Sequence, residues 1–163
     1  MRAKLTLAVF LACLTALVCG ARADDRWTLY ANDRFGAHLA YPAAIFVMQP
    51  PPENDDGRTL VAADGAKILV FGAYNVMDET LAAKRASLVG PDYARVVYRA
   101  SGANWFVVSG YRDIGGVESI FYEKYILSAA SDTIHSLIVT YPSALKSRYD
   151  PIAARVAASF GGP

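Results

Sequence analysis

Hydrophobic and polar residues alternate along much of residues 94–141, and this period of two is typical of β-strands. At the start of the stretch, Val96 and Tyr98 are expected on the same face of a strand. The segment Trp105–Tyr111 is apolar on both faces, which predicts an interior strand covered on both sides. Short turns imply antiparallel neighbours. We therefore predict a meander of three or four strands, divided by the turn clusters Ser101–Asn104, Asp113–Gly116 and Ala129–Asp132.

The residues before the meander predict further strands. Trp27–Ala31 and Phe35–Tyr41 are expected to be strands, and Pro42 ends the second because it cannot donate to a ladder. A helical turn over Ala43–Met48 would bury Ile45 and Phe46. The proline-rich segment Gln49–Gly57 is expected to be a long irregular loop. Asp64-Gly65 is a strong two-residue turn signal, which predicts a hairpin of the segments Arg58–Ala62 and Ala66–Tyr74.

Two helices are predicted besides the strands. The first spans Asp78–Leu88, with Asp78 as its N-cap and Gly90-Pro91 as its stop signal. A short helical piece over 143–148 follows the last strand, and a final helix starts at Asp150-Pro151 with Asp150 as N-cap. In that helix Ile152, Val156 and Phe160 form an apolar stripe that we expect to dock on the sheet. The order of elements predicts an α+β fold in which helices pack on an antiparallel β-sheet of about six to eight strands.

Residues 1–23 have the pattern of a cleaved secretory signal peptide. Arg2 and Lys4 precede an apolar run that is too short to span a membrane comfortably, and Ala21-Arg22-Ala23 fits the cleavage rule. An uncleaved anchor is the alternative, and a lipoprotein fits less well because Val18 precedes Cys19. We therefore expect residues 24–163 to form one domain, exported to the periplasm or alternatively secreted, with no stable membrane span in the mature chain.

Removal of the leader changes the composition. The 16 Lys and Arg residues lose Arg2, Lys4 and Arg22, which leaves 13 basic against 15 acidic residues and a net charge of about −2. Such a balance argues against a nucleic-acid partner, which requires concentrated positive charge. The chain has two cysteines, Cys13 and Cys19, and both leave with the leader. The mature chain is therefore expected to have neither a disulfide nor a thiol nucleophile.

Several short motifs are spread along the chain, namely Arg34–Pro42, Asn54–Gly57, Asp64-Gly65, Val70–Gly72, Tyr149–Ile152 and Ser159-Phe160. Together they resemble those of small exported bacterial proteins of the PsbP/DcrB-like group. The resemblance covers most of residues 27–160 and implies an α-β-α sandwich around an antiparallel sheet. It also implies an accessory or assembly role, and it brings no catalytic motif.

The sequence offers little catalytic chemistry. His38 and His135 would have to converge with a carboxylate to bind a metal, and otherwise each is a partly buried histidine bonded to backbone or water. The acidic segment Glu53–Asp56 lacks the spacing of a calcium loop and is expected to be a solvated turn. Glu118 and Glu123 should lie on opposite faces of their strand, as surface charges facing basic side chains. We expect no cofactor and no metal.

The aromatic residues of the meander have two interpretations. The preferred one is that they line the sheet core with their hydroxyls at its rim, and the alternative is a binding face of Tyr98, Trp105, Tyr111, Tyr122 and Tyr125. Our leading hypothesis is a periplasmic accessory or binding protein without catalytic activity, whose partner is an envelope protein or a small ligand. The alternatives are a binder of small ligands or envelope polymers that uses the aromatic face with the 49–57 loop, and a hydrolase with a scattered active site.

Overall fold

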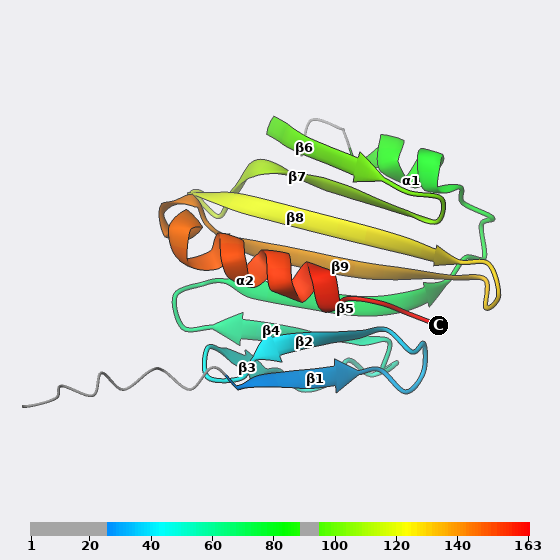
Figure 1. Ribbon diagram of the computed structural model, residues 1–163, viewed down its shortest axis with the longest axis horizontal. Coiled ribbons are helices and arrows are strands. Elements are labelled where there is room, and N and C mark those ends of the chain that lie inside the picture. Colours follow the sequence, from blue (N-terminus) through cyan, green and yellow to red (C-terminus); the bar gives the residue numbers. More distant parts are fainter. Residues whose placement is uncertain (1–25, 89–94) are drawn as a thin grey trace, which may run out of the picture.

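The computed structural model describes residues 26–88 and 95–163. The expected signal peptide and the Gly90-Pro91 stop lie outside the described residues. The large sheet is fully antiparallel (Figure 1). Its order is β3 (Phe46–Met48), β4 (Gly57–Ala62), β5 (Lys67–Tyr74), β9 (Thr133–Pro142), β8 (Val117–Ser128), β7 (Trp105–Ile114) and β6 (Arg95–Ser101). The other elements are the hairpin of β1 (Trp27–Ala31) and β2 (His38–Pro42), the helices α1 (Leu81–Ser87) and α2 (Lys146–Ser159), and a 3₁₀ turn over Ser143–Leu145.

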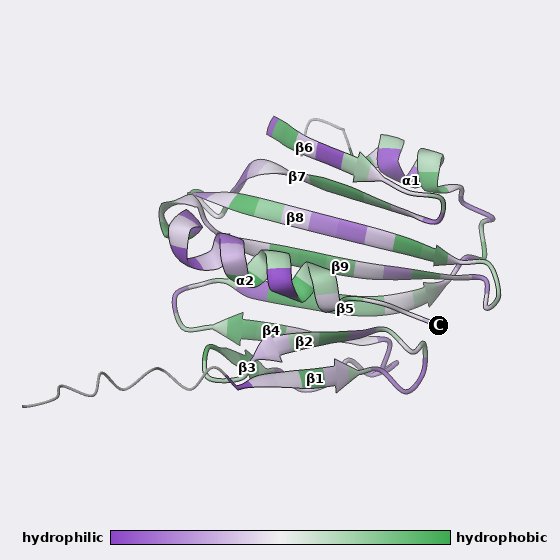
Figure 2. Ribbon diagram, viewed as in Figure 1, coloured by the Kyte–Doolittle hydropathy of each residue, from purple (hydrophilic) through white to green (hydrophobic). Residues whose placement is uncertain are grey.

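One face of the large sheet is covered by α2 together with the β1–β2 hairpin, as Figure 1 shows. The predicted stripe of α2 docks there, because Val156 and Phe160 are buried and Ile152 is partly buried against the same core. The Tyr149 side chain of α2 is fully buried, and its ring packs against the rings of Phe46 and Tyr141. In Figure 2 α2 alternates between hydrophobic and hydrophilic residues, as an amphipathic helix does, whereas β7 is hydrophobic over its first part and more polar toward the β7–β8 turn.

The opposite face is covered over only part of its width. The short helix α1 packs beside β7, where Leu88 joins a smaller core with Phe106, Val108 and Phe121. Among the described elements, no helix packs against β4 or β5 on this side. The fold is therefore α+β, as predicted, with a complete layer on one face of the sheet and an incomplete layer on the other.

The predicted meander is confirmed as β6 to β9, and the hairpin around Asp64-Gly65 is confirmed as β4 and β5. One prediction within the meander is wrong. A β-bulge at Val97 shifts the register, so that Val96 pairs with Gly110 and Tyr98 with Ser109. Consequently Val96 and Tyr98 point to opposite faces.

Three further local predictions are wrong, and they concern residues 46–48, the N-cap of α1 and the start of the final helix. Residues Phe46–Met48 form the edge strand β3 and no helical turn, because pairing of Phe46 with Ala62 buries the Phe46 ring. The N-cap of α1 is Thr80, whose hydroxyl accepts from the Ala83 N–H at 3.1 Å, since Asp78 lies in a turn with φ +50°.

The final helix also begins earlier than predicted. It starts at Lys146, and Pro151 lies inside it at the cost of one backbone hydrogen bond. Asp150 is therefore not an N-cap. Its carboxylate instead accepts the Tyr141 hydroxyl at 2.8 Å and pairs with Lys146, one turn earlier in the helix. These two contacts hold the first turn in place.

The C-terminal segment covers both histidines. Gly161 pairs with His38 through two backbone hydrogen bonds of 3.0 Å, and a Cβ at Gly162 would lie 2.5 Å from the His135 ring. His135 is fully buried, and its Nε2 lies 3.0 Å from the Thr133 hydroxyl. Burial, together with nearby His38, lowers the pKa of His135 below its usual value of 6.5.

We predict that Phe160→Ala lowers the free energy of unfolding by about 3–5 kcal/mol, because the ring is lost from a buried site on the sheet. Urea denaturation measures the change. The matched control is Leu29→Ala, whose side chain is 69% exposed and should cost less than about 0.5 kcal/mol. Equal effects of the two substitutions would contradict docking of the α2 stripe.

We also predict that stability falls as the pH drops through about 6.5. The folded pKa of His135 is depressed, so the unfolded chain binds the proton first and is favoured at acid pH. Denaturation at about pH 7.5 and about pH 5 measures this loss. His135→Gln should remove much of it, while His38→Gln should keep most of it because burial is the larger cause. If His135→Gln lost as much stability at acid pH as the unmodified protein, this assignment would be refuted.

Candidate functional site

The uncovered part of the large sheet presents a continuous row of side chains. In β5 the even-numbered residues Ile68 and Val70 enter the main core, so the odd-numbered residues face the other way. Strand register extends this surface onto β9, because Leu69 pairs with Ile138. We call this surface the open face, and it comprises Lys67, Leu69, Phe71, Ala73, Ile134, Ser136, Ile138 and Thr140. Its β5 residues are exposed or partly exposed, whereas Ile134, Ser136 and Thr140 of β9 are buried. It has a cavity at each end.

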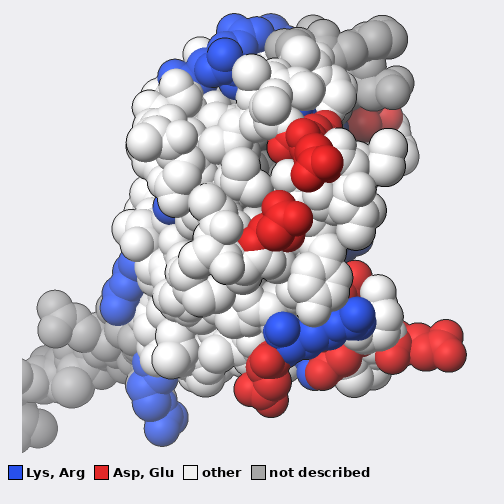
Figure 3. All heavy atoms as spheres, turned by 90° about the vertical axis from the view of Figure 1, so that its right-hand side faces the viewer, with Lys and Arg blue, Asp and Glu red and all other residues white. Residues whose placement is uncertain are grey.

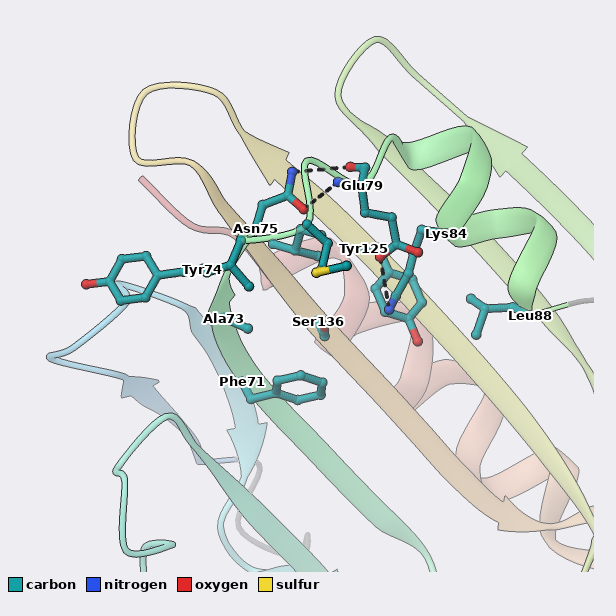
Figure 4. A pocket seen from close by; sticks show the side chains of 12 residues that line it. Phe71, Ala73, Tyr74, Asn75, Glu79, Lys84, Leu88, Tyr125 and Ser136 are labelled. Atoms are coloured by element: carbon teal, nitrogen blue, oxygen red, sulfur yellow. Dashed lines mark hydrogen bonds and ion pairs between the residues drawn. The ribbon is translucent and has the colours of Figure 1, made fainter.

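The first cavity lies between α1 and the end of β5, and it has a volume of about 220 Å³ (Figure 4). Phe71, Leu88 and Tyr125 point toward this space from three different elements, whereas Tyr74 points away. The Tyr74 ring instead meets Phe35 on the opposite side of the sheet, with centroids 5.0 Å apart. The cavity wall is therefore largely apolar and aromatic.

The turn after β5 forms the rim of this cavity and is fixed by Asn75. The buried Asn75 side chain donates to the Glu79 carbonyl at 3.2 Å and accepts from the Glu79 N–H at 2.9 Å. The Asn75 N–H donates to the Asp132 carbonyl at 2.9 Å, which ties the turn to the β8–β9 connection. Between these anchors Val76 and Met77 are 81% and 83% exposed. The turn thus holds two large apolar side chains in solvent.

A charged side chain closes the other side of the cavity. Lys84 of α1 lies 3.4 Å from Glu79 and 5.9 Å from the centre of the Tyr125 ring. Tyr125 stacks on Phe106 with ring centroids 5.0 Å apart, and its hydroxyl donates to Glu123 at 2.8 Å. The ammonium and the aromatic wall together give this cavity an apolar floor and a polar rim.

Glu123 forms a buried ion pair beside the open face. Its side chain is 1% exposed, and one carboxylate oxygen lies 3.1 Å from Arg112. The Arg112 guanidinium lies over the Phe121 ring at 5.2 Å. The prediction that Glu123 is a surface charge is wrong, although Glu118 is exposed and lies 3.6 Å from Arg95 on the opposite face. The signal in the sequence was an acidic residue between Phe121 and Tyr125, two positions away on the same face.

The second cavity lies at the opposite end of the open face, between the β7–β8 hairpin and the β4–β5 turn. Its volume is about 600 Å³. Leu69 and Ile138 contribute from the open face, and the hairpin contributes Ile114 and Val117. Two cationic side chains, Lys67 and Arg112, and one carboxylate, Asp64, also line it.

The predicted aromatic face is divided by the sheet. Tyr98, Tyr111 and Tyr122 lie on the α2 side, where Tyr98, Ser109 and Tyr122 follow one another across three strands. Burial, together with nearby Tyr98, raises the pKa of Tyr122 to about 12. Trp105 shares that side, because it alternates with buried Phe106 on β7, whereas Tyr125 faces the first cavity.

A smaller cavity of about 240 Å³ lies between Tyr111, Tyr122 and α2. The Arg95 guanidinium lies 4.1 Å from the centre of the Tyr111 ring, so a cation of the protein already occupies one aromatic face. The 49–57 loop lies on the other side of the sheet, where it lines a cavity with Leu69 and Phe71. The tyrosines and this loop therefore do not share a cleft.

The remaining candidates have local hydrogen-bond partners. His38 Nδ1 lies 3.1 Å from the Gly36 carbonyl oxygen. In the acidic loop Asn54 donates to Asp56 at 2.9 Å, and Asp55 pairs with Arg58 at 2.5 Å. Within residues 26–88 and 95–163, no group of three or more His, Cys, Asp and Glu side chains is arranged to hold a metal ion.

Comparison with known proteins supports the fold. No protein-family model and no curated protein matches the sequence. Among solved structures, cyanobacterial PsbP (CyanoP) of Synechocystis sp. PCC 6803 aligns with a TM-score of 0.63 at 11% identity, over 89% of this chain and 97% of its own. The Ran-binding protein Mog1p of Saccharomyces cerevisiae aligns with a TM-score of 0.59 at 9% identity, over 83% and 95%. The chain therefore has the PsbP/Mog1-like fold, and its resemblance to PsbP-like proteins is confirmed at the level of the fold.

Proposed function

We propose that this chain is an exported binding protein of the bacterial envelope without catalytic activity, and that a partner protein docks around the 75–79 turn. The basic and apolar leader followed by Ala21-Arg22-Ala23 supports export. In the described part of the chain, no helix is both long and apolar enough to cross a membrane. The likeness to Mog1p, which is a Ran-binding protein, supports a binding role for a fold of this kind.

The observation that carries the proposal is the exposure of Val76 and Met77 on a turn fixed by Asn75. Large apolar side chains held in water are unfavourable unless another surface covers them. Because the turn is already ordered by the Asn75 hydrogen bonds, little conformational entropy is lost when a partner binds. Methionine adds a flexible side chain that adapts to a partner's surface.

The size of the neighbouring cavity favours a protein partner over a small ligand at this end. Ligand pockets usually measure about 300–1,000 Å³, and the cavity under the turn measures about 220 Å³. It has room for one apolar side chain of a partner against Phe71 and Leu88. Figure 3 views the molecule from the end toward which β5 runs, where a broad uncharged area separates small groups of acidic and basic residues. This pattern suits a protein interface more than a nucleic-acid interface.

The positions of the histidines also favour binding over hydrolysis. His135 is buried beneath the C-terminal segment, and its ring nitrogen contacts the Thr133 hydroxyl. His38 contacts the Gly36 carbonyl. A hydrolase of the serine type requires a base that contacts both a nucleophile and an orienting carboxylate at an accessible site. These two histidines have other partners.

Site-specific crosslinking tests the proposal. A photoreactive amino acid at Met77 in the full chain, expressed in the envelope of its own host, should give a discrete crosslinked product with one partner. The matched control is the same amino acid at Leu29, which is 69% exposed on the β1–β2 hairpin and should give no such product. Products of equal yield at both positions, or none at Met77, would overturn the proposal.

A second variant separates binding from folding. Val76→Ser with Met77→Ser should lower the affinity for the crosslinked partner by about tenfold or more, because both apolar contacts are lost. Stability should change by less than about 0.5 kcal/mol, since both side chains are exposed. Fractionation of the same cells tests export, and recovery of the chain with its leader intact in the cytoplasm would contradict that part of the proposal.

A further inference from the structure

The 600 Å³ cavity at the far end of the open face combines apolar walls with positive charge. Its floor is formed where Leu69 pairs with Ile138 and Lys67 pairs with Thr140. One wall is the tip of the β7–β8 hairpin, where Ile114 and Val117 are 43% and 48% exposed. The glycines of that tip, Gly115 and Gly116, have positive φ and close the turn tightly. We call this cavity the basic groove.

Asp64, which lines the basic groove, and Glu123, which lies beside it, both already have partners. Asp64 accepts the Tyr149 hydroxyl at 2.7 Å and the Arg148 guanidinium at 2.9 Å, which joins the β4–β5 turn to α2. Glu123 is buried against Arg112 and Tyr125. Lys67 is exposed and forms no ion pair with another described residue. The groove therefore offers a lysine ammonium to an incoming anion.

Arg112 lies at the edge of the groove and is fixed in place, with its charge balanced by Glu123. Its contacts with Glu123 and with the Phe121 ring hold the guanidinium along the sheet at the edge of the groove. A guanidinium that is oriented before binding loses little entropy when a ligand arrives. The unpaired charge that an anion would meet in the groove is therefore that of Lys67, beside a guanidinium that is already oriented.

We propose that the basic groove binds a single-chain anionic amphiphile, namely an acyl chain that ends in a carboxylate. The carboxylate would lie against Lys67 near Arg112, and the chain would lie along Leu69, Ile138 and the exposed hairpin residues. The volume of about 600 Å³ falls within the usual range for small-molecule sites.

Binding of laurate to the purified chain tests this proposal by calorimetry and by NMR. We expect saturable binding of one laurate per chain, with the largest chemical-shift changes at Leu69, Ile138 and Val117. Acetate, which has the headgroup alone, should not bind detectably. Dodecyl maltoside below its micellar concentration, which has the chain with a neutral headgroup, should bind at least about tenfold more weakly.

Two variants and a control assign the contacts. Lys67→Met keeps the length of the side chain and removes its charge, and it should weaken laurate binding about tenfold or more. Val117→Ser should weaken binding through the loss of apolar contact. Arg85→Met, at an exposed cation of α1, should leave binding unchanged. Circular dichroism confirms that each variant is folded.

Three results would overturn the proposal. Equal binding of laurate and dodecyl maltoside would indicate general hydrophobic adsorption. Unchanged laurate affinity in Lys67→Met would show that the charge of Lys67 does not recognise the carboxylate. Flotation of the protein with vesicles of anionic phospholipid, without binding of monomeric laurate, would assign the groove to a membrane surface. None of these results depends on crosslinking at Met77, so the two proposals fail separately.

Discussion

The structure depends on the antiparallel pairing of β5, β9, β8 and β7, whose successive side chains pack on opposite faces of one sheet. Every second residue of β5 and β9 enters the core under α2, which fixes the register of these strands. The intervening residues must then face the other side, where α1 covers only the part near β7. The open face is therefore a direct consequence of a long sheet with one short covering helix.

The buried pair of Glu123 and Arg112 separates the two ends of that face. Such a pair adds little net stability, because the loss of hydration offsets most of the attraction between the charges. Its geometry instead fixes the Tyr125 ring at one cavity and the Arg112 guanidinium at the other. The apolar cavity at one end and the basic groove at the other thus share one polar anchor.

The sequence predicts those features that depend on local patterns. Alternation and turn residues predict the meander, and the spacing of Val156 and Phe160 predicts how α2 docks. Features that depend on distant residues are not predictable in this way. The strand at Phe46 requires Ala62 as its partner, and the burial of Glu123 requires Arg112 from the neighbouring strand. Local patterns do not predict the open face either, because its extent depends on how much of the sheet α1 covers.

Carbene footprinting of the chain, both purified and inside its own cells, tests the central claim most directly. The claim is that the β5 side of the open face and the 75–79 turn are accessible in the isolated protein and occupied in the cell. We predict labelling of Leu69, Phe71, Val76 and Met77 in the purified chain and marked protection of these residues in cells, while Val70 and Leu137 of the core stay unlabelled in both. Equal labelling of the open face in the two conditions would contradict the account.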